Sequence, residues 1–443
     1  MTDSAFLRHG SRIGANSWGR SSRAMISLVL FFGIALSPLS DFMSVYALKG
    51  QVGGDMGARY SLFVRGAMVA GLLAVMLFSG RVRFSNLRTC LLALLVVLVS
   101  CAALSFDEMA GGEFIEEVIV IAKVFSFFIY VAAFAELEDA QLEKIETLIR
   151  ITLLVYALAI IAGAVFSIDI FRSYRGDTQI RAGYKGIVYA QNEASALLLS
   201  GMALAYLHVI RNGWSARRIG LVVALFAAAF LLGTKGALVA CFGVVAAYSF
   251  ARYGVVKATV WLATVIVLML ATAVAIYYLV PSVHQAVDLS IQYFSYQSDH
   301  AGGGKIATVL MSGRNVKFAN VWDDLADKNF LPLLTGGYPI VRYLIEMDGP
   351  DLALIMGIPV FCLYLWSIFK LYARPGDGQV AQYGKYIFVL LIIIACTAGH
   401  VLTSAIVAPF LAVVADLVRR WSNDSREDAA RGQWSFEERV KNG

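Results

Sequence analysis

Charged side chains are scarce in this chain. Asp, Glu, Lys and Arg together make up 15% of its 443 residues, whereas hydrophobic residues make up 59%. A soluble globular protein carries about 25% charged residues. Apolar runs long enough to cross a bilayer, which takes roughly 20 residues each, recur from Ala24 to about Arg419. The low charge therefore excludes an ordinary soluble protein and predicts a polytopic protein of the inner-membrane type.

Cysteine pairs and the common catalytic signatures are also missing. The five cysteines lie far apart within apolar runs and form no C-x-x-C pair, so they indicate neither disulfides nor a metal site. There is no Walker loop, no H-E-x-x-H helix, no G-x-S-x-G elbow and no dinucleotide fingerprint. We therefore expect no metal, no cofactor and no nucleic-acid partner. Any chemistry must use charged residues near one face of the membrane.

The apolar runs predict an all-α fold with about 12 transmembrane helices and one large outer loop that contains amphipathic helices. The predicted spans are residues 24–40, 60–79, 89–106, 114–135, 147–167, 190–210, 218–233, 236–251, 257–280, 351–371, 383–399 and 401–418. The corresponding domains are an N-terminal arm (1–23), a bundle of spans 1 to 9 (24–280), the outer loop (281–349), spans 10 to 12 (350–418) and a tail (419–443).

Basic residues indicate how these spans are oriented. The short loops on one side of the membrane, together with the arm and the tail, hold most of the Lys and Arg residues. Cytoplasmic loops carry such an excess, so both termini are predicted to be cytoplasmic. The arm has four arginines before the first span, and no convincing cleavage site follows them. This pattern predicts a retained first helix rather than a removed signal peptide.

The loop of residues 167–189 is unusually basic for the outer side. Its basic residues run against the charge bias of translocated loops and are Arg172, Arg175, Arg181 and Lys185. This excess predicts an anionic client. The alternative is a solvated surface in which these residues pair with two acids of the same loop, Asp169 and Asp177.

The outer loop of residues 281–349 is too long for a simple connection and is therefore predicted to be functional. It contains two amphipathic stretches, one over Val283, Val287, Ile291 and Phe294 and one over Phe318, Val321, Trp322 and Leu325. Gly302, Gly303 and Gly304 supply a flexible break between them. We expect this loop to lie on the membrane and to cover a cavity.

The charged candidates near the outer face fall into two groups. The basic ones are Arg65, Arg172, Arg175, Arg181, Lys235 and Arg314, and the acidic ones are Glu193, Glu346, Asp348 and Asp351. Arginine forks can grip a phosphate or diphosphate bidentately, and carboxylates can accept the hydrogen of a sugar hydroxyl. Together they predict an outward cavity that binds an anionic, sugar-bearing ligand.

Several of these residues also have simpler explanations. Lys235 can extend to lipid headgroups, and Glu193 and Asp351 can each serve as the acid of a first helical turn. Lys123, in the middle of the fourth span, is a functional candidate by its depth, although no acidic partner is evident. His400, near the end of the eleventh span, is more often a hydrogen-bonded structural group at such a place. Helix capping does not explain Glu346 and Asp348.

The order of the motifs resembles that of the O-antigen polymerase and O-antigen ligase superfamily of bacterial membrane enzymes. The matching pieces are Arg181 followed by Y-A-Q-N-E-A-S-A, then L-L-G-T-K-G-A-L, S-G-R-N-V-K-F-A-N-V-W, L-L-T-G-G-Y and E-M-D-G-P-D-L-A-L-I-M-G-I-P. The resemblance covers residues 170 to 360, and the earlier spans match only in being hydrophobic. These enzymes act on glycans linked to undecaprenyl diphosphate.

The resemblance implies a glycosyltransferase C-like fold, no metal, and arginines in the two outer loops that hold the donor diphosphate. It carries over to Arg181 and Arg314 as catalytic residues. As substrate-binding residues we predict Arg172, Arg175, Asn192, Glu193, Lys235 and Tyr338. Lys235 takes the place of an arginine that the family often has in that tight turn. Ligases of the family have a histidine near the end of the large loop, where this chain has Arg342 and Tyr343.

The missing histidine favours a polysaccharide repeat-unit polymerase, in which Glu346 or Asp348 contacts the acceptor. The expected partners are an undecaprenyl-diphosphate-linked oligosaccharide, membrane lipids and a chain-length regulator protein. The expected location is the bacterial inner membrane, with the active site at the periplasmic face. The alternatives are an O-antigen ligase, which shares the donor site, and a transporter of the same lipid. A transporter would show paired repeats or broken helices around a midplane site, and no inverted repeat is present.

Overall fold

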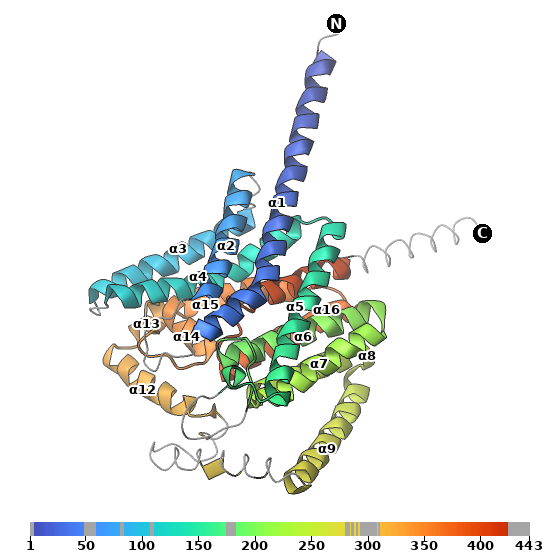
Figure 1. The fold of residues 1–443 in the computed structure, drawn as a ribbon. Helices are drawn as coiled ribbons and strands as arrows, with labels where there is room; N and C mark the ends of the chain where they lie inside the picture. The colour runs from blue at the N-terminus through green and yellow to red at the C-terminus, as the bar shows by residue number, and fades with distance from the viewer. Residues whose placement is uncertain are drawn as a thin grey trace, which may run out of the picture.

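The computed structural model describes residues 4–47, 59–79, 84–106, 110–173, 183–279 and 311–423, together with the single positions 284, 288, 291–292 and 308. These parts of the chain are helical, and their sole β-type pairing is a bridge between Arg172 and Tyr184 (Figure 1). The structure therefore confirms the all-α class. The helices are α1 (Ser4–Ala47), α2 (Tyr60–Phe78), α3 (Phe84–Phe106), α4 (Gly111–Glu136), α5 (Asp139–Val165), η1 (Asp169–Phe171), α6 (Gln191–Asn212), α7 (Ala216–Leu232), α8 (Lys235–Tyr253), α9 (Val255–Leu279), α12 (Arg314–Asp327), α13 (Leu331–Thr335), α14 (Asp348–Met356), α15 (Ile358–Tyr372), α16 (Gln379–Thr397) and a final helix over residues 408–423.

Seven helices in the described ranges are long and apolar enough to cross a membrane. They are Ser21–Ala47 of α1, then α2, α4, α5, α6, α8 and α16. Shorter apolar helices cover Leu91–Ala102, Val255–Val267 and Ile358–Tyr372. These helices support a membrane-embedded protein with many spans, while the count of 12 stays a prediction. The amphipathic stretch that begins at Val283 lies outside the described residues except for Ile291.

The predicted span of residues 351–371 is not one helix. It divides into α14 and α15 at Gly357, whose φ of 74° is in the left-handed region that favours glycine. The backbone of the outer loop crosses there: a Cβ on Gly336 would lie 2.6 Å from the Ile355 carbonyl oxygen, and one on Gly357 would lie 2.6 Å from that of Leu334. Gly337 N donates to the Ile355 oxygen at 2.9 Å. The loop thus satisfies a carbonyl that the break exposes.

The last predicted span also starts later than expected, since helix begins at residue 408 rather than 401. Residues 398–407 form an irregular connection that approaches the start of α14. The Asp348 carboxylate accepts hydrogen bonds from this connection, at 2.7 Å from His400 N, 2.6 Å from Val401 N and 2.7 Å from Leu402 N. Because these amides sit in a buried part of the chain, they need such an acceptor.

Polar side-chain contacts join the loops and helix ends at each of the two ends of the bundle. At one end the pairs are Arg23–Glu138, Arg420–Asp139 and Arg252–Gln379, at 2.6, 2.7 and 2.8 Å. At the other end they are Arg59–Glu116 and Arg342–Glu113, at 2.9 and 2.6 Å. Each pair joins residues that the charge pattern assigns to one side of the membrane. The contacts agree with the predicted alternation of loops, and the assignment of the first end to the cytoplasm stays a prediction.

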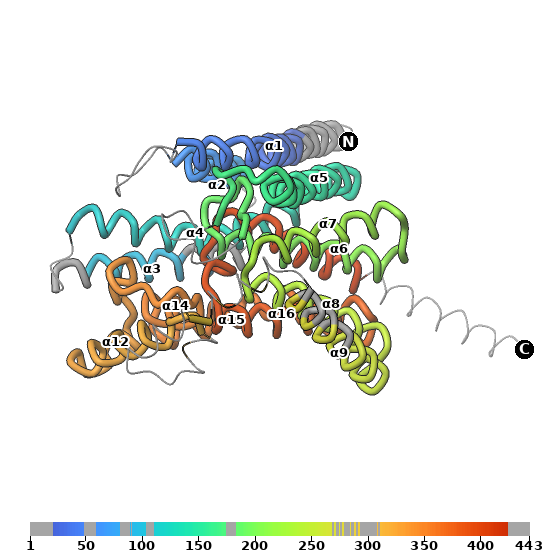
Figure 2. Tube along the Cα trace, turned by 60° about the horizontal axis from the view of Figure 1, so that its bottom comes forward, coloured from blue at the N-terminus to red at the C-terminus, as the bar shows by residue number. Residues whose placement is uncertain are grey.

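Two packed groups of helices lie within the described residues. Helices α1, α2 and α5 lie side by side, whereas α6 packs with α7, α8 and α16 (Figure 2). Helix α6 is the most enclosed of the seven candidate spans. Its first residue, Gln191, is at the same end as the loop of residues 183–190. This end of α6, which the sequence predicts to face outward, is called the outer end.

Candidate functional site

A cavity of about 430 Å³ lies at the outer end of α6, α8 and α16. Its polar wall contains residues from four separate stretches of sequence, and its apolar wall is formed by the helices below them. The lining residues include Asn192, Ser195, Thr234, Lys235, Ser312, Arg314, Thr397 and Gly399 on the polar side, with Ala196, Leu199, Val239, Ala240, Ile393 and Ile394 on the apolar side.

The turn between α7 and α8 forms one part of the polar wall. Gly233 ends α7 with a left-handed conformation (φ 70°), and Thr234 begins α8 by accepting a hydrogen bond from Ala237 N at 3.2 Å. A glycine at the end of one helix and a threonine before the next are the residues that these backbone positions favour. Lys235 is therefore held at the first helical position, at the cavity.

The start of α6 binds this turn directly. Ser195 Oγ and Thr234 Oγ1 are 2.9 Å apart, and Gln191 Nε2 donates to the Leu232 carbonyl oxygen at 3.2 Å. Asn192, on the same face of α6 as Ser195, lines the cavity. The motifs Y-A-Q-N-E-A-S-A and L-L-G-T-K-G-A-L, which are separate in the sequence, therefore form one wall of the cavity.

Arg314 contributes the third stretch of this polar wall. It is the first residue of α12, after Gly313 at φ 83°, and its Nη1 lies 3.4 Å from the Thr397 carbonyl oxygen. Its buried Nε has no hydrogen-bond partner within the described residues. Arg314 and Lys235 thus bring two cationic groups to one cavity whose remaining lining is neutral. Such a site attracts an anion, because charges interact more strongly where water is partly excluded.

Glu346 lies at the rim of the cavity rather than in its lining. Its carboxylate contacts Lys317 Nζ at 2.6 Å, and this pair is partly exposed. A Cβ on the cavity-lining Gly399 would lie 2.8 Å from the Glu346 carbonyl oxygen. The backbone of Glu346 is therefore against the cavity wall, and its side chain is directed to α12 by Lys317.

Asp348 differs from Glu346 in that both of its oxygens are occupied. Besides the three amides of the 398–407 connection, Thr403 Oγ1 donates to it at 2.8 Å. The side chain is buried, with 2% of its surface exposed. These four donors occupy both carboxylate oxygens, so neither oxygen is directed to the cavity. We assign Asp348 to holding the connection that includes Gly399 and Val401.

Asp351 has a similar local role. Its two oxygens accept hydrogen bonds from Ile345 N and Met347 N, each at 3.1 Å. These bonds shape the turn that contains Glu346, whose φ of 67° is unusual for a residue with a Cβ. The two acids in the first turn of α14, Asp348 and Asp351, therefore fix the backbone at the cavity rim through hydrogen bonds.

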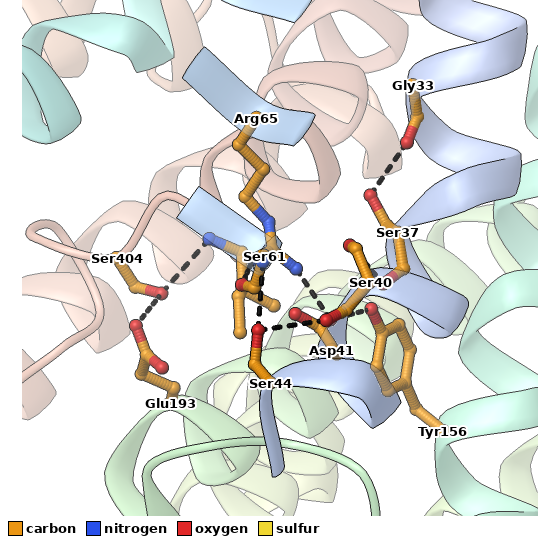
Figure 3. Close-up of polar contacts among 11 residues, drawn as sticks. Gly33, Ser37, Ser40, Asp41, Ser44, Ser61, Arg65, Tyr156, Glu193 and Ser404 are labelled. Carbon is orange, nitrogen blue, oxygen red and sulfur yellow. Dashed lines mark hydrogen bonds and ion pairs between the residues drawn. The ribbon is translucent and has the colours of Figure 1, made fainter. Parts of the chain in front are cut away.

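The other predicted site residues are not in the cavity lining. Tyr338 is buried and donates to Asp324 at 2.8 Å, which joins the loop to α12. Glu193 accepts a hydrogen bond from Ser404 at 2.9 Å (Figure 3). Arg172 is 3.5 Å from Asp169, as the solvated alternative predicts. Arg175 and Arg181 lie outside the described residues.

Sequence reasoning missed five polar residues at the site. Ser195, Thr234 and Ser312 lie inside the quoted motifs but have no charge, so they did not stand out. Thr397 lies at the end of a predicted span, and Lys317 lies one turn after Arg314. The sequence points to Lys317 only through its helical spacing from Arg314, three residues earlier. Within the described residues, no group of three or more His, Cys, Asp and Glu could hold a metal ion.

Comparisons of the chain with models of protein families, with curated proteins and with solved structures give no match. The order of the motifs and the geometry of this cavity are therefore the grounds on which a function can be argued.

Proposed function

We propose that this protein is a polysaccharide repeat-unit polymerase with a glycosyltransferase C-like arrangement of about 12 spans in a bacterial inner membrane. Its donor is a growing glycan on undecaprenyl diphosphate, and its acceptor is a single lipid-linked repeat at the periplasmic face. The product is an O-antigen, exopolysaccharide or capsule chain that is longer by one repeat.

One observation carries the proposal: Lys235 and Arg314, more than 70 residues apart in the chain, line one cavity whose opposite wall is apolar. A lipid-linked diphosphate has the matching pair of properties, an anionic head and a hydrocarbon tail. The guanidinium suits the diphosphate oxygens because it can donate two parallel hydrogen bonds. The neutral Asn192, Ser195 and Thr234 are suited to sugar hydroxyls.

In the proposed reaction, an acceptor hydroxyl oxygen attacks the anomeric carbon of the donor sugar. A carbon–oxygen bond forms there as the bond from that carbon to the diphosphate breaks, so the diphosphate leaves with the bonding electron pair. Arg314 and Lys235, with Arg181 as the family resemblance implies, stabilise the charge that develops on it. One preorganised donor of this kind is commonly worth about 3–4 kcal/mol.

The acceptor hydroxyl must also lose its proton in this reaction. Glu346 is partly exposed at the rim, and among the described residues its carboxylate pairs with Lys317, so we assign it to orienting or deprotonating the acceptor. Asp348 has no such freedom, because four donors occupy it. A diphosphate is a good leaving group, so a weak base is sufficient.

The test compares Arg314→Ala, Lys235→Met and Glu346→Gln with the wild type in a strain that lacks the native gene. Lys370→Ala, a change at the opposite end of α15, is the matched control for loss of a basic residue. The readouts at equal protein level are glycan length and the amount of lipid-linked single repeats. We expect loss of long chains and accumulation of single repeats outside the inner membrane. Normal chain length in all three site variants would refute the proposal.

A ligase is the second candidate, and one observation favours it. His400 lies between Gly399 and Val401, both of which line the cavity, and ligases of the resembling family have a histidine near the outer loop. The same experiment separates the two functions, because loss of a ligase leaves long lipid-linked chains that never reach their final acceptor.

A transporter is the less favoured alternative. The division between α14 and α15 is a broken helix of the kind that transporters use for binding. Here the freed carbonyl oxygens of Ile355 and Leu354 accept hydrogen bonds from Gly337 N and Tyr338 N. They are therefore committed to the loop rather than to an ion. Single repeats retained on the cytoplasmic side in the variants would favour transport.

A further inference from the structure

Helix α12 has three distinct faces. Val321 and Leu325 are buried against the rest of the protein, with 4% and 3% of their surfaces exposed. Phe318 and Trp322 are neighbours of this stripe on the helix, yet they are exposed. The opposite side carries Asp323 and Asp327, which are exposed as well. The sequence predicts a single apolar face here, and the structure divides it into a core stripe and an outward stripe.

The outward stripe continues beyond α12. The rings of Phe318 and Trp322 are 5.9 Å apart, and Trp322 is 5.1 Å from Phe330. Leu331 and Leu334 of α13 extend the surface, and more than half of each side chain is exposed. These five residues, Phe318, Trp322, Phe330, Leu331 and Leu334, are the aromatic strip. A continuous apolar surface that stays exposed in the folded protein indicates an interaction site.

The aromatic strip joins an exposed apolar surface of α15. The Leu334 carbonyl oxygen lies against Gly357, the residue that precedes α15. The next residue, Ile358, is 47% exposed, and Leu363 and Trp366 further along α15 are 49% exposed each. In Figure 1, α13 is beside α14 and α15. One apolar surface therefore runs from the short apolar helix α15 onto α13 and α12.

We propose that the aromatic strip docks α12 and α13 into the interfacial layer of the bilayer, on the leaflet at the outer end of the bundle. Three observations support a lipid surface rather than a protein partner. The strip is continuous with the apolar surface of α15, its Trp, Phe and Leu side chains are the types that form the apolar face of interfacial helices, and Asp323 and Asp327 lie on the opposite side of α12. An interfacial helix has this division into an apolar face and a charged face.

The docking has a consequence for Arg314. This residue begins α12, one turn before Phe318, and a helix turn rises about 5.4 Å. Holding the strip among lipid headgroups therefore holds the guanidinium near the depth of the lipid phosphates. Docking would set the depth at which the cavity receives an anionic lipid head. The inference about docking itself does not depend on the reaction that the cavity catalyses.

The experiment measures the depth of nitroxide labels in nanodiscs of phosphatidylethanolamine and phosphatidylglycerol. Trp322→Cys and the matched Asp323→Cys are made in a full-length chain whose five native cysteines are replaced by serine or alanine. Phe318→Cys repeats the measurement one turn away, in case one variant does not fold. Oxygen reports contact with lipid, and a water-soluble nickel chelate reports contact with water.

We expect the labels at 322 and 318 to be relaxed several-fold more by oxygen than by the chelate, with the reverse preference at 323. Equal access of the chelate to positions 322 and 323 would overturn the proposal. Protection of position 322 from both reagents would also overturn it, since it would mean that protein covers the strip. These results are independent of glycan transfer, so failure here and failure of the proposed function are separable.

Discussion

The guanidinium of Arg65 lies 2.6 Å from the carboxylate of Asp41, and both side chains are buried between α1, α2 and α5 (Figure 3). The Tyr156 hydroxyl donates to the same carboxylate oxygen, and Ser61 accepts from the guanidinium. Charges at such a depth are retained when they are paired. This network accounts for Arg65, which the sequence marks only as a cation near the outer face.

Removing one partner of this pair should destabilise the protein strongly. Asp41→Asn leaves the Arg65 charge buried without its counter-charge, which typically costs about 3–5 kcal/mol. The double variant Asp41→Leu with Arg65→Met removes both charges and should be much closer to the wild type. The measurement is the midpoint of thermal unfolding in one detergent. If the single and double variants unfold at the same temperature, the pair is not coupled.

The crossing of Gly336 and Gly357 should tolerate no side chain. Both have positive φ, and an added Cβ at either meets backbone atoms at 2.6 Å. Gly336→Ala and Gly357→Ala should each cost about 1–3 kcal/mol, since a backbone clash cannot be relieved by a rotamer change.

Gly220 in α7 is the control for this pair, because nothing lies within 4 Å of its would-be Cβ. Gly220→Ala should leave the unfolding midpoint unchanged or slightly raised, since alanine is the better helix former. A loss of stability in this control equal to that in the two crossing variants would mean that the crossing is not specifically intolerant.

Asp348→Asn should lower stability and glycan synthesis together. The asparagine amide group would face the amides of His400, Val401 and Leu402, so at least one donor loses its acceptor. An unsatisfied buried donor costs about 1–3 kcal/mol. The connection that includes Gly399 would then be released from the cavity wall. Unchanged unfolding temperature with lost activity would instead make Asp348 a participant in the chemistry.

Glu346 and Lys317 should behave differently from each other if Glu346 contacts the acceptor. Glu346→Gln should lower kcat at nearly unchanged stability, because a partly exposed ion pair contributes only about 0–1 kcal/mol. Lys317→Ala removes the same ion pair but leaves the carboxylate, so long glycan chains should persist. The measurement is turnover of purified protein with lipid-linked repeats. Equal loss in both variants would mean that the ion pair, rather than the carboxylate, is needed.

Much of the helical layout follows from local sequence. The predicted spans 60–79, 190–210 and 236–251 correspond closely to α2 (Tyr60–Phe78), α6 (Gln191–Asn212) and α8 (Lys235–Tyr253). A segment in lipid must satisfy its backbone groups internally, so an apolar run becomes helical whatever its neighbours are. The alternation of basic loops likewise agrees with the two ends that the ion pairs define.

The sites of tight backbone contact could not be predicted in this way. Gly357 looks like a tolerated glycine within an apolar run, and its role depends on Gly336, which belongs to the loop. Asp348 looks like a free acid at a helix start, and its four donors come from residues more than 50 positions later. Both assignments depend on which distant backbone approaches.

The sequence by itself determined the class of this protein, its apolar helices and the residue types that can hold an anionic ligand, because composition and helix formation act over short stretches of chain. Only the tertiary structure decided which charged residues share a cavity. Arg314 and Lys235 converge there, Glu193 and Tyr338 are turned into structural contacts, and Glu346 and Asp348, two residues apart, receive different environments. Long-range packing decides such outcomes, since the partners of a buried charge come from other helices.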